Sequence, residues 1–333
     1  MIFLVNKSQT RRSFEAILHS MKQIILLLDK DNYLVFYNDY AKEVLGLRLS
    51  DLNTKPSSIF STKILEGASF DGSSEITYQD KIYSVNMYKV ENSLVKQIEK
   101  VVILNNVTQE RKIAETKKDF FAYSSHELKS PLTAIIGYSE LMTLKMVESE
   151  EHEDLIKRIH SQAMQMLLLV EDMSTLSRLE SVNESLELHE NHNLKNILEA
   201  TLYSQEQFIK EKAIIINSNI EDVFLYCLKL DLNKLFKNLI ENAIKYSNSG
   251  SAIDITLRNN ASKIEFIIKD YGIGISKENE SRVFERFYRV DKGRVSPGSG
   301  LGLAIVKHIV IKYGGTIKLD SKLGSGTEIK ITF

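Results

Sequence analysis

The stretch FAYSSHELKSPL, at residues 121–132, constrains the fold of this chain more than any other segment. Apolar side chains recur at every seventh position through it and beyond it, at Phe121, Leu128, Ile135 and Met142. This spacing predicts a helix of a helical bundle. His126 lies off that apolar face, so we expect its imidazole to face water. Pro131 cannot donate a hydrogen bond to the carbonyl of residue 127, so we expect the helix to bend just after the histidine.

The same stretch brings three chemically useful side chains together. His126 is followed directly by Glu127, and Ser130 lies four residues on, one helical turn along the same face. A neutral imidazole beside a carboxylate can act as a nucleophile. An isolated histidine–glutamate pair is usually only part of a solvated helix surface, so the chemical interpretation depends on the rest of the chain.

Composition excludes several classes of function. The 333 residues suffice for two or three domains with well-buried cores. Basic and acidic side chains nearly balance, 43 against 44, so charge gives no support for a nucleic-acid partner. The single cysteine, Cys227, excludes an internal disulfide and a metal site with several cysteines, and it suits a reducing compartment. We therefore expect a cytoplasmic protein.

Residues 1–13 form a separate N-terminal segment. No apolar run in the chain approaches the roughly 20 residues that a membrane helix requires, and the opening MIFLV is too short for a signal peptide. In one interpretation this segment is a first strand or a loose end. In the other it is the remainder of a membrane segment from a longer sensor, with Arg11 and Arg12 on the cytoplasmic side.

Residues 14–106 are predicted to form a small α+β domain. An apolar run at 24–28 is typical of a buried strand, and a polar turn at 29–32 leads to a second strand at 33–37. Asn38 and Asp39 are good caps for a short helix that ends at Gly46. Further strands are expected at 74–78, 81–90 and 100–105. The domain has no cysteine, and its only histidine, His19, precedes the first strand, so the sequence points to no particular ligand.

From residue 107 the pattern becomes helical, and residues 107–183 are the next predicted domain. After the acidic link VESEEHED, a second heptad seam contains Ile156, Ile159, Ala163, Met166, Val170 and Met173. Two seamed helices joined by a short link predict an antiparallel hairpin. A lone hairpin cannot bury both seams, so two copies should pair as a four-helix bundle, which makes the protein a homodimer. Histidines outside the main stretch have no spacing that suggests a metal site: His152, His160, His189 and His192.

Residues 190–333 alternate between helical and strand patterns, after a connector at 181–196. Helices are expected at 194–212, 231–246 and 304–313, and strands at 213–220, 253–258, 263–270, 316–320 and 327–333. This pattern predicts an α/β sandwich with a mixed sheet and covering helices. The whole chain is thus predicted to be multidomain, with an α+β domain, a helical hairpin and an α/β sandwich in that order.

One helix of the third domain suits a nucleotide. The string NLIENAIKYS places Asn238, Asn242 and Lys245 on successive turns of one face, with Tyr246 alongside. Amide oxygens can ligate Mg²⁺, and a lysine can contact phosphate. Each residue taken singly could equally belong to a polar helix surface.

A second motif, DYGIGI, follows a predicted strand. The carboxylate of Asp270 can accept the amino hydrogens of adenine, and Gly272 and Gly274 would let the backbone approach the base. Alone, this string is a common turn.

Two further strings could close around phosphate. GSGLGLAIVK places Gly298, Gly300 and Gly302 directly before a helix, where free amides bind phosphate. It is neither a Rossmann nor a P-loop motif, because no strand leads straight into it and no GK[ST] follows. FERFYR, at 284–289, supplies aromatic and arginine side chains in a predicted loop, where exposed phenylalanine should pack on a nucleotide or on a neighbouring helix.

These strings together resemble the sensor histidine kinases of two-component systems. FAYSSHELKSPL resembles their phospho-acceptor box, NLIENAIKYS their asparagine box, DYGIGI their first glycine box and GSGLGLAIVK their second. This resemblance covers about residues 107–333. Residues 14–105 resemble a PAS sensory domain in pattern alone, and Asn106 stands where the exit from such a domain more often has aspartate, which would weaken one capping or salt-bridge contact.

The resemblance implies a reaction and a site for it. ATP would phosphorylate His126, Glu127 would accept a proton from the ring, and the phosphate would pass to an aspartate in the receiver domain of a response regulator. Asn242 would ligate Mg²⁺, Lys245 would contact phosphate, and Asp270 would select adenine beside Tyr246. The other implied cofactor-binding residues are Asn238, Gly272, Gly274, Phe284, Phe287, Arg289, Gly298, Gly300, Leu301 and Gly302.

Ser130 stands where this family positions a water that dephosphorylates the regulator. Threonine or asparagine is commoner there, and serine lacks the threonine methyl, so the strength of any phosphatase activity is left open. Two other functions fit part of the sequence. An ATPase of the gyrase, Hsp90 and MutL superfamily would not need His126, and a signalling scaffold with a silent ATP site would not need every motif residue intact. The sequence also leaves open the PAS signal, the regulator and whether transfer is in cis or in trans.

Overall fold

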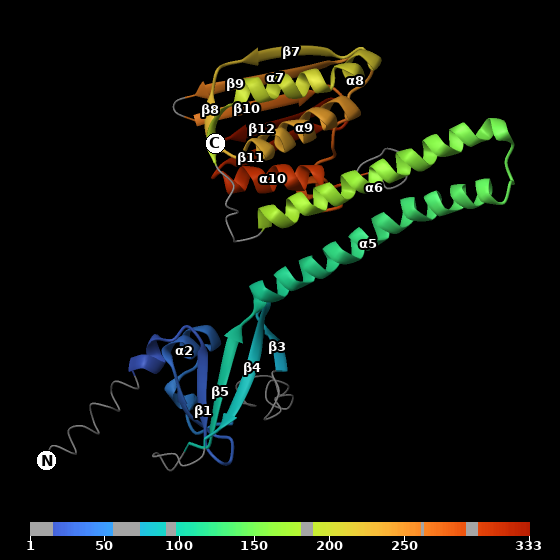
Figure 1. Cartoon of the computed structure of the whole chain (residues 1–333). Helices are drawn as coiled ribbons and strands as arrows, with labels where there is room; N and C mark the ends of the chain where they lie inside the picture. The colour runs from blue at the N-terminus through green and yellow to red at the C-terminus, as the bar shows by residue number, and fades with distance from the viewer. Residues whose placement is uncertain (1–15, 56–73, 91–97, 181–188, 261–262, 291–298) are drawn as a thin grey trace. The chain divides into compact units, whose positions relative to one another are not determined.

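The computed structural model describes residues 16–55, 74–90, 98–180, 189–260, 263–290 and 299–333. The chain divides into two compact units, Met1–Asp119 and Phe120–Phe333. The long helix α5 (Thr108–Thr143) begins in the first unit and continues into the second (Figure 1). No helix within the described ranges is both long and apolar enough to cross a membrane.

The first unit is built on a five-stranded antiparallel sheet with the strand order β2-β1-β5-β4-β3. Its elements are β1 (Ile24–Leu28), β2 (Leu34–Tyr37), α2 (Asp39–Leu45), η1 (Leu49–Asp51), β3 (Ser74–Tyr78), β4 (Lys81–Lys89) and β5 (Lys100–Asn106). All five residues of β1 are buried, as its continuous apolar run predicted. The predicted strands agree with these bounds to within one residue.

Asn38 ties together several segments of this unit. Its buried side chain accepts hydrogen bonds from Ile25 N and Ala41 N, both at 3.1 Å, so it caps α2 as predicted. Its amide group donates to the carbonyls of Gln23 at 2.8 Å and Leu18 at 3.0 Å. A fully buried amide is thereby satisfied on both sides, which fixes the start of α2 against β1.

Asn106 caps the start of α5 with its side chain. Its side-chain oxygen accepts hydrogen bonds from Thr108 N at 3.1 Å and Thr108 Oγ at 2.6 Å. One turn on, Arg111 forms an ion pair with Glu75. The capping contact is therefore present with asparagine.

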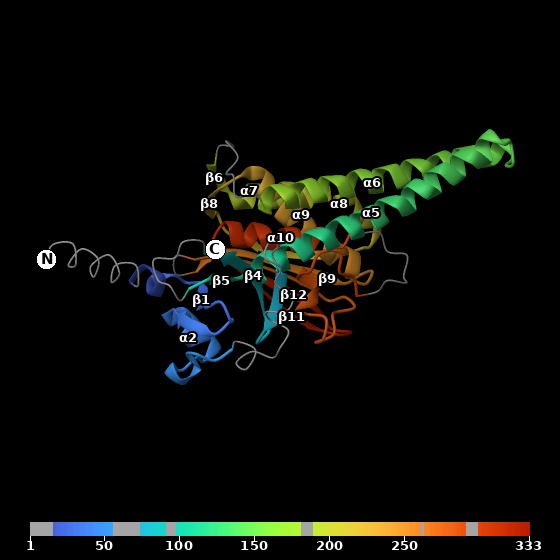
Figure 2. The same ribbon diagram turned by 90° about the horizontal axis from the view of Figure 1, so that it is seen from below.

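The second unit begins with the predicted hairpin, formed by α5, the short turn η2 (Ser149–Glu151) and α6 (His152–Glu180). Figure 2 shows α5 and α6 running alongside each other toward their connection. α5 continues through Pro131, whose side chain is buried.

The predicted seam of α6 is only partly covered within one chain, where Ile159, Met166 and Met173 are half-buried. The buried side chains are Leu155, Leu169 and Leu176, whereas Ile156 and Val170 are exposed. The two stripes differ by one residue, which rotates a helix by about 100°. Heptad spacing alone does not distinguish them, because α6 carries apolar residues in both stripes. The exposed stripe is available to a second copy of the hairpin.

The rest of the second unit is an α/β sandwich. Its main sheet has the order β11-β12-β10-β9-β7, antiparallel except for the parallel pair β7–β9, and β6 and β8 form a separate two-stranded sheet. Helix α9 packs between α7 and α10 and against the main sheet (Figure 1). The elements are β6 (Glu190–Asn193), α7 (Leu194–Ser204), α8 (Glu206–Glu211), β7 (Ile215–Ile220), β8 (Phe224–Cys227), α9 (Lys229–Tyr246), β9 (Ala252–Asn260), β10 (Lys263–Asp270), η3 (Arg282–Phe284), α10 (Gly302–Lys312), β11 (Thr316–Lys322) and β12 (Gly326–Thr332).

A buried charge cluster fastens α6 to this sandwich. The carboxylate of Asp231, at the start of α9, is fully buried and accepts hydrogen bonds from Tyr313 Oη at 2.7 Å, from Lys312 Nζ at 2.9 Å and from Arg178 of α6. Burial alone would raise the pKa of Asp231, but these hydrogen bonds outweigh it and hold the pKa below its ordinary value. Cys227 lies close by, and burial raises the pKa of its thiol to about 12.

Replacing Asp231 by asparagine should lower the free energy of unfolding by about 3–5 kcal/mol, because Arg178 and Lys312 would keep buried charges without their counter-ion. Chemical denaturation of both proteins measures the loss, and the exposed Asp222→Asn is the control, with little change expected. Since the pKa of Asp231 is lowered on folding, its contribution is present above about pH 4 and is lost as the pH falls through the folded-state value. A stability difference that does not shrink below about pH 4 would contradict this assignment.

Candidate active site

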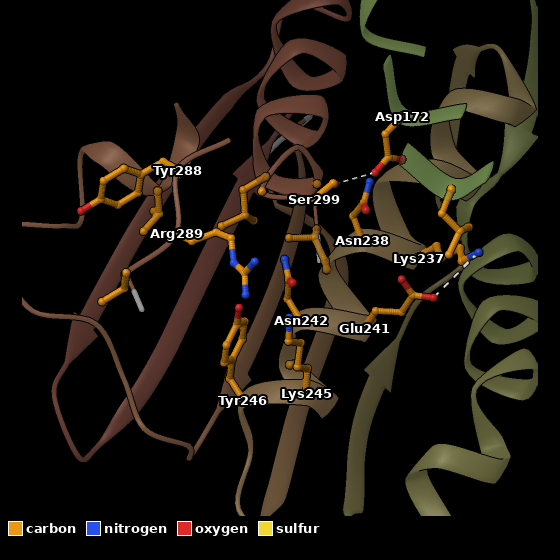
Figure 3. Close-up of a pocket in the computed structure, with 18 of the residues that line it drawn as sticks. Asp172, Lys237, Asn238, Glu241, Asn242, Lys245, Tyr246, Tyr288, Arg289 and Ser299 are labelled. Atoms are coloured by element: carbon orange, nitrogen blue, oxygen red, sulfur yellow. Dashed lines mark hydrogen bonds and ion pairs between the residues drawn. The ribbon is translucent and has the colours of Figure 1, made fainter. Parts of the chain in front are cut away.

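A cavity of about 840 Å³ lies in the second unit, and Figure 3 shows part of its lining. Its walls come from α9, from the loop after β10, from residues 283–290, from residues 299–303 and from β11 and β12. Helices α5 and α6 of the hairpin complete it. The predicted nucleotide motifs thus meet around one cavity.

The predicted face of α9 lines this cavity with Asn238, Asn242, Lys245 and Tyr246. The spacings of four and three residues place these side chains on one side of the helix. The amide nitrogen of Asn238 is buried and has no hydrogen-bond partner among the described residues. A buried donor of this kind costs about 1–3 kcal/mol unless a ligand or water satisfies it, so it is an unfilled hydrogen-bonding position in the wall.

Asp270 forms another part of the lining, at the end of β10. Its carboxyl is buried and accepts a hydrogen bond from Gly272 N at 2.9 Å. Burial raises the pKa of Asp270 above its ordinary value, although backbone hydrogen bonds act in the opposite direction. A desolvated carboxylate of this kind gains from a hydrogen-bond donor such as the amino group of a base.

Gly272 lies against the end of α9 and outside the cavity lining. A Cβ atom added there would lie 2.0 Å from the carbonyl oxygen of Tyr246. This glycine was expected to make room for the base, whereas the structure shows that it makes room for the backbone at the end of α9. Gly274 does line the cavity, and it has the left-handed backbone that favours glycine, with φ of 66°.

The cations of the site converge on α9. Figure 3 shows Arg289 pointing toward Asn242 and Tyr246, close to Lys245. Burial and the charge of Arg289 lower the pKa of Lys245. An anion bound here would oppose both effects, which suits a site for phosphate.

The second glycine motif borders the same space. Ser299, Gly300 and Gly302 line the cavity, and α10 begins at Gly302. Leu301 is fully buried beneath them in the core, and Gly298 lies outside the described residues. The first amides of a helix are an anion site, so this edge also suits phosphate.

The aromatic string FERFYR divides between two tasks. Arg289 lines the cavity, as does Tyr288, which sequence reasoning missed. Phe287 packs on α5 instead, with ring centroids 5.6 Å from Phe120 and 5.9 Å from Tyr123. Phe284, in η3, is half-buried and outside the lining. Packing on a helix was one of the two environments expected for these phenylalanines.

Sequence reasoning also missed the strand residues Thr327 and Ile329, which line the cavity from β12. Their pattern is that of an ordinary sheet face, so nothing in the sequence distinguished them. It missed Asp172 of α6 as well. This carboxylate pairs with Lys234 of α9 at 2.6 Å. It also accepts a hydrogen bond from Ser299 Oγ at 2.9 Å (Figure 3).

His126 is exposed on α5, as predicted from its position off the apolar face. Its side chain is 83% exposed, and its Nδ1 atom lies 3.9 Å from an oxygen of Glu127. Glu127 and Pro131 line the cavity, whereas His126 and Ser130 are outside its lining. Within the part of the chain that the structure describes, no cluster of histidine, cysteine, aspartate and glutamate could hold a metal ion.

Two family models match the second unit. Residues 116–182 match the His Kinase A (phospho-acceptor) domain, and residues 228–333 match the histidine kinase-, DNA gyrase B- and HSP90-like ATPase. These two segments hold the exposed histidine and most of the cavity wall. The chain thus carries the phospho-acceptor and ATPase domains of a histidine kinase. The kinase match at the hairpin sets it apart from ATPases that share only the nucleotide domain.

Individual relatives agree with membership in the histidine kinases. The sensor protein SrrB of Staphylococcus aureus is 27% identical over 336 residues, which cover 96% of this chain and 55% of that protein. The chain therefore spans about half the length of the curated relatives it matches. The solved structure of the histidine kinase AdeS of Acinetobacter baumannii is 26% identical, with a TM-score of 0.53, and the match covers 62% of this chain and 96% of that one.

A third likeness concerns the fold alone. The structure of the histidine kinase ThkA in complex with the response regulator protein TrrA is 20% identical, with a TM-score of 0.52. That match covers 96% of this chain and 97% of the ThkA chain. The order of the hairpin and the α/β sandwich is therefore shared with a solved histidine kinase.

Proposed function

We propose that this chain is an ATP-dependent protein-histidine kinase that phosphorylates His126. The observation that carries the proposal is the composition of the cavity wall. Asn242, Lys245 and Asp270 line it together with Glu127, the immediate neighbour of His126. A nucleotide site whose wall includes the neighbour of a nucleophile suits phosphoryl transfer, since this reaction depends mainly on positioning and charge stabilisation.

ATP fits the wall by the chemistry of its parts. The buried Asp270 would accept the amino hydrogens of adenine beside Tyr246, and Lys245, with Arg289 close by, would face the phosphates. The unfilled amide nitrogen of Asn238 offers a further donor. Mg²⁺ would be held by the amide oxygen of Asn242, which lines the cavity, because oxygen atoms are the ligands that this ion prefers. The bound ion would neutralise charge on the phosphates.

The position of Glu127 determines which ring nitrogen of His126 loses its proton and which one attacks. Glu127 lies on the Nδ1 side of His126, so Nε2 is the nitrogen free to attack the γ-phosphorus. A bond forms between Nε2 and phosphorus as the bond to the β–γ bridging oxygen breaks, and ADP leaves. Glu127 accepts the Nδ1 proton after its distance to the ring, now 3.9 Å, shortens to hydrogen-bond range.

The partners follow from the same proposal. The phosphate would pass to an aspartate in the receiver domain of a response regulator. The solved ThkA structure, in which that kinase is in complex with the response regulator protein TrrA, supports a partner of this kind. Two copies would pair through the exposed stripes of the hairpin as a homodimer. The first unit would act as a PAS sensory domain for a small-molecule or physical signal, supported by its antiparallel sheet and short helices. The proposed domain bounds are 14–106, 107–183 and 190–333. The protein would act in the cytoplasm, with attachment to the membrane if the chain belongs to a longer sensor.

The test is to incubate the purified protein with γ-labelled ATP and Mg²⁺. Label that is stable in alkali and lost in acid is expected, because a phosphoramidate has those properties and a phosphoester does not. ATP hydrolysis without protein-bound label would instead support an ATPase, and binding without turnover would support a silent scaffold.

Replacing Asn242 by aspartate should weaken productive binding of Mg²⁺–ATP, because it adds a negative charge beside the phosphates and alters the ligands of the ion. Initial rates of labelling should fall most strongly at limiting Mg²⁺. Asn219→Asp is the matched control, since Asn219 is exposed on β7 and lies outside the cavity lining, so its labelling should be that of wild type. Wild-type rates at limiting Mg²⁺ would count against Asn242 as a ligand.

Replacing Ser130 by alanine should slow dephosphorylation of the partner regulator and spare self-labelling. Ser130 is exposed on α5, one turn from His126, where one water could bridge the two sites. Loss of one well-placed hydrogen bond to a transition state costs about 10²-fold in rate. The measurement is the lifetime of regulator phosphate in the presence of ADP and each protein. Equal lifetimes would show that Ser130 is only a surface residue.

A further inference from the structure

The cavity is walled by both helices of its own hairpin. Glu127 and Pro131 of α5 and Ser161 and Met164 of α6 line it together with the nucleotide motifs, and all belong to one chain. The space into which a terminal phosphate would extend is thus bounded by the helix that carries His126 in the same chain.

A direct contact beside the nucleotide site holds α5 close to it. Phe287, two residues before Arg289, packs on Phe120 and Tyr123. These two residues precede His126 by six and three positions, or about 9 and 4.5 Å along the helix axis. Arg286 lies over the ring of Phe120 at 5.6 Å and pairs with Glu180 of α6. The segment beside the cavity therefore touches both helices of its own hairpin within two turns of the phospho-acceptor.

Buried charges fix the sandwich to α6 at two further points. Asp172 of α6 joins Lys234 of α9 and Ser299 of the second glycine motif, with its side chain only 13% exposed. Arg178 joins the fully buried Asp231. Breaking such pairs leaves unpaired buried charge, which costs several kcal/mol. The sandwich is thereby held beside the hairpin of its own chain.

The faces of α5 place His126 at the edge of this contact. At about 100° per residue, Tyr123 lies about 60° and Glu127 about 100° from His126 on one side. The exposed apolar residues Phe121 and Leu132 lie about 120–140° away on the other side. A second hairpin that covered those apolar residues would leave the side of His126 next to its own ATP domain uncovered.

We infer that each chain phosphorylates its own His126, so that phosphoryl transfer within the dimer is in cis. This inference rests on the proposed kinase function and adds which of the two histidines receives the phosphate. The bond formed joins Nε2 of His126 to the γ-phosphorus of the ATP bound by the same chain, and ADP leaves from that chain.

The test uses heterodimers of two differently tagged full-length chains, purified through both tags in turn. One chain carries His126→Gln and keeps its ATP site, and the other carries Asn242→Asp and keeps its histidine. Transfer in cis predicts no label above the level of the two homodimeric variants. Label on the Asn242→Asp chain, at its His126, would overturn the inference in favour of transfer in trans.

A second heterodimer tests whether absence of label in the first one is caused by transfer in cis or by loss of activity in heterodimers generally. Wild type paired with the double variant His126→Gln/Asn242→Asp should label its wild-type chain at about half the level of the wild-type homodimer, since one complete site remains. Absence of label in this pair would overturn the inference, because a complete chain would then need its partner. A wild-type homodimer that takes up no label would refute the kinase function itself, so the two failures are distinguishable.

Phe287 gives an independent readout. In the same heterodimer, Phe287→Ala in the wild-type chain should reduce labelling about tenfold or more, because a small misplacement of the reacting groups has a large cost in rate. The same substitution in the double-variant chain should change nothing. An effect only from the double-variant chain would show that the phenylalanine acts on the partner's helix and would also overturn transfer in cis.

Discussion

Replacing His126 by glutamine should reduce acid-labile labelling of the protein to background, with nucleotide affinity unchanged. The side chain is 83% exposed, so the substitution removes the nucleophile and disturbs little packing. Glutamine is also a good helix former, so α5 should keep its structure. The cavity wall does not include His126, which is why binding and labelling should separate.

The measurement pairs labelling with titration of a fluorescent ATP analogue. His192→Gln is the matched control, because His192 lies on β6 and outside the cavity lining, and it should label like wild type. Acid-labile label that persists on His126→Gln would assign the acceptor to another histidine.

Replacing Gly272 by alanine should lower ATP affinity and labelling by about 10²-fold or more, the cost of a displacement of about 1 Å in a reactive site. The added Cβ would lie 2.0 Å from the carbonyl oxygen and 2.6 Å from the carbonyl carbon of Tyr246. Both contacts are backbone atoms, so either the last turn of α9 or the loop after Asp270 must move. The hydrogen bond from Ile273 N to Tyr246 O, at 3.2 Å, joins the same two segments.

Gly137→Ala is the matched control for this change. A Cβ at Gly137 has nothing within 4 Å, and alanine in a helix is favoured over glycine by up to about 1 kcal/mol. Circular dichroism and thermal unfolding distinguish a local shift from loss of the fold. A Gly272→Ala protein that binds ATP like wild type would show that the loop adapts without moving the site.

Part of the cavity lining could be predicted because it is carried by short strings of polar residues and glycine. Asn242, Lys245 and Asp270 were each assigned to nucleotide binding from motifs that resemble those of a family, and the structure places all three in the lining of one cavity. The strands of the two five-stranded sheets could be predicted, because their apolar residues alternate or run continuously. Both strands of the two-stranded sheet were missed. β6, with the sequence ENHN, has no hydrophobic pattern to distinguish it from a connector, and β8 has only the four residues FLYC.

Contacts between residues far apart in the sequence could not be predicted, for a different reason. Asp172, Arg178 and Glu180 of α6 meet residues that lie 53 or more positions further along the chain. Their sequence is that of an ordinary solvated helix face, and only the fold reveals which of these charges are buried. The sequence also did not distinguish the stripe of α6 that is buried within the chain from the stripe expected to face a second copy, because both are apolar.

The rate at which Cys227 reacts with a thiol reagent can measure how often this domain opens. Cys227 is the only cysteine of the chain and is fully buried, and its raised pKa leaves almost no thiolate at neutral pH. A thiol reagent can therefore reach it only when the region around β8 and α9 opens. The rate of modification at saturating reagent reports how often that opening occurs. A nucleotide bound to α9 should slow the reaction. The ratio of the rates with and without ATP then measures how far the nucleotide suppresses opening of the domain.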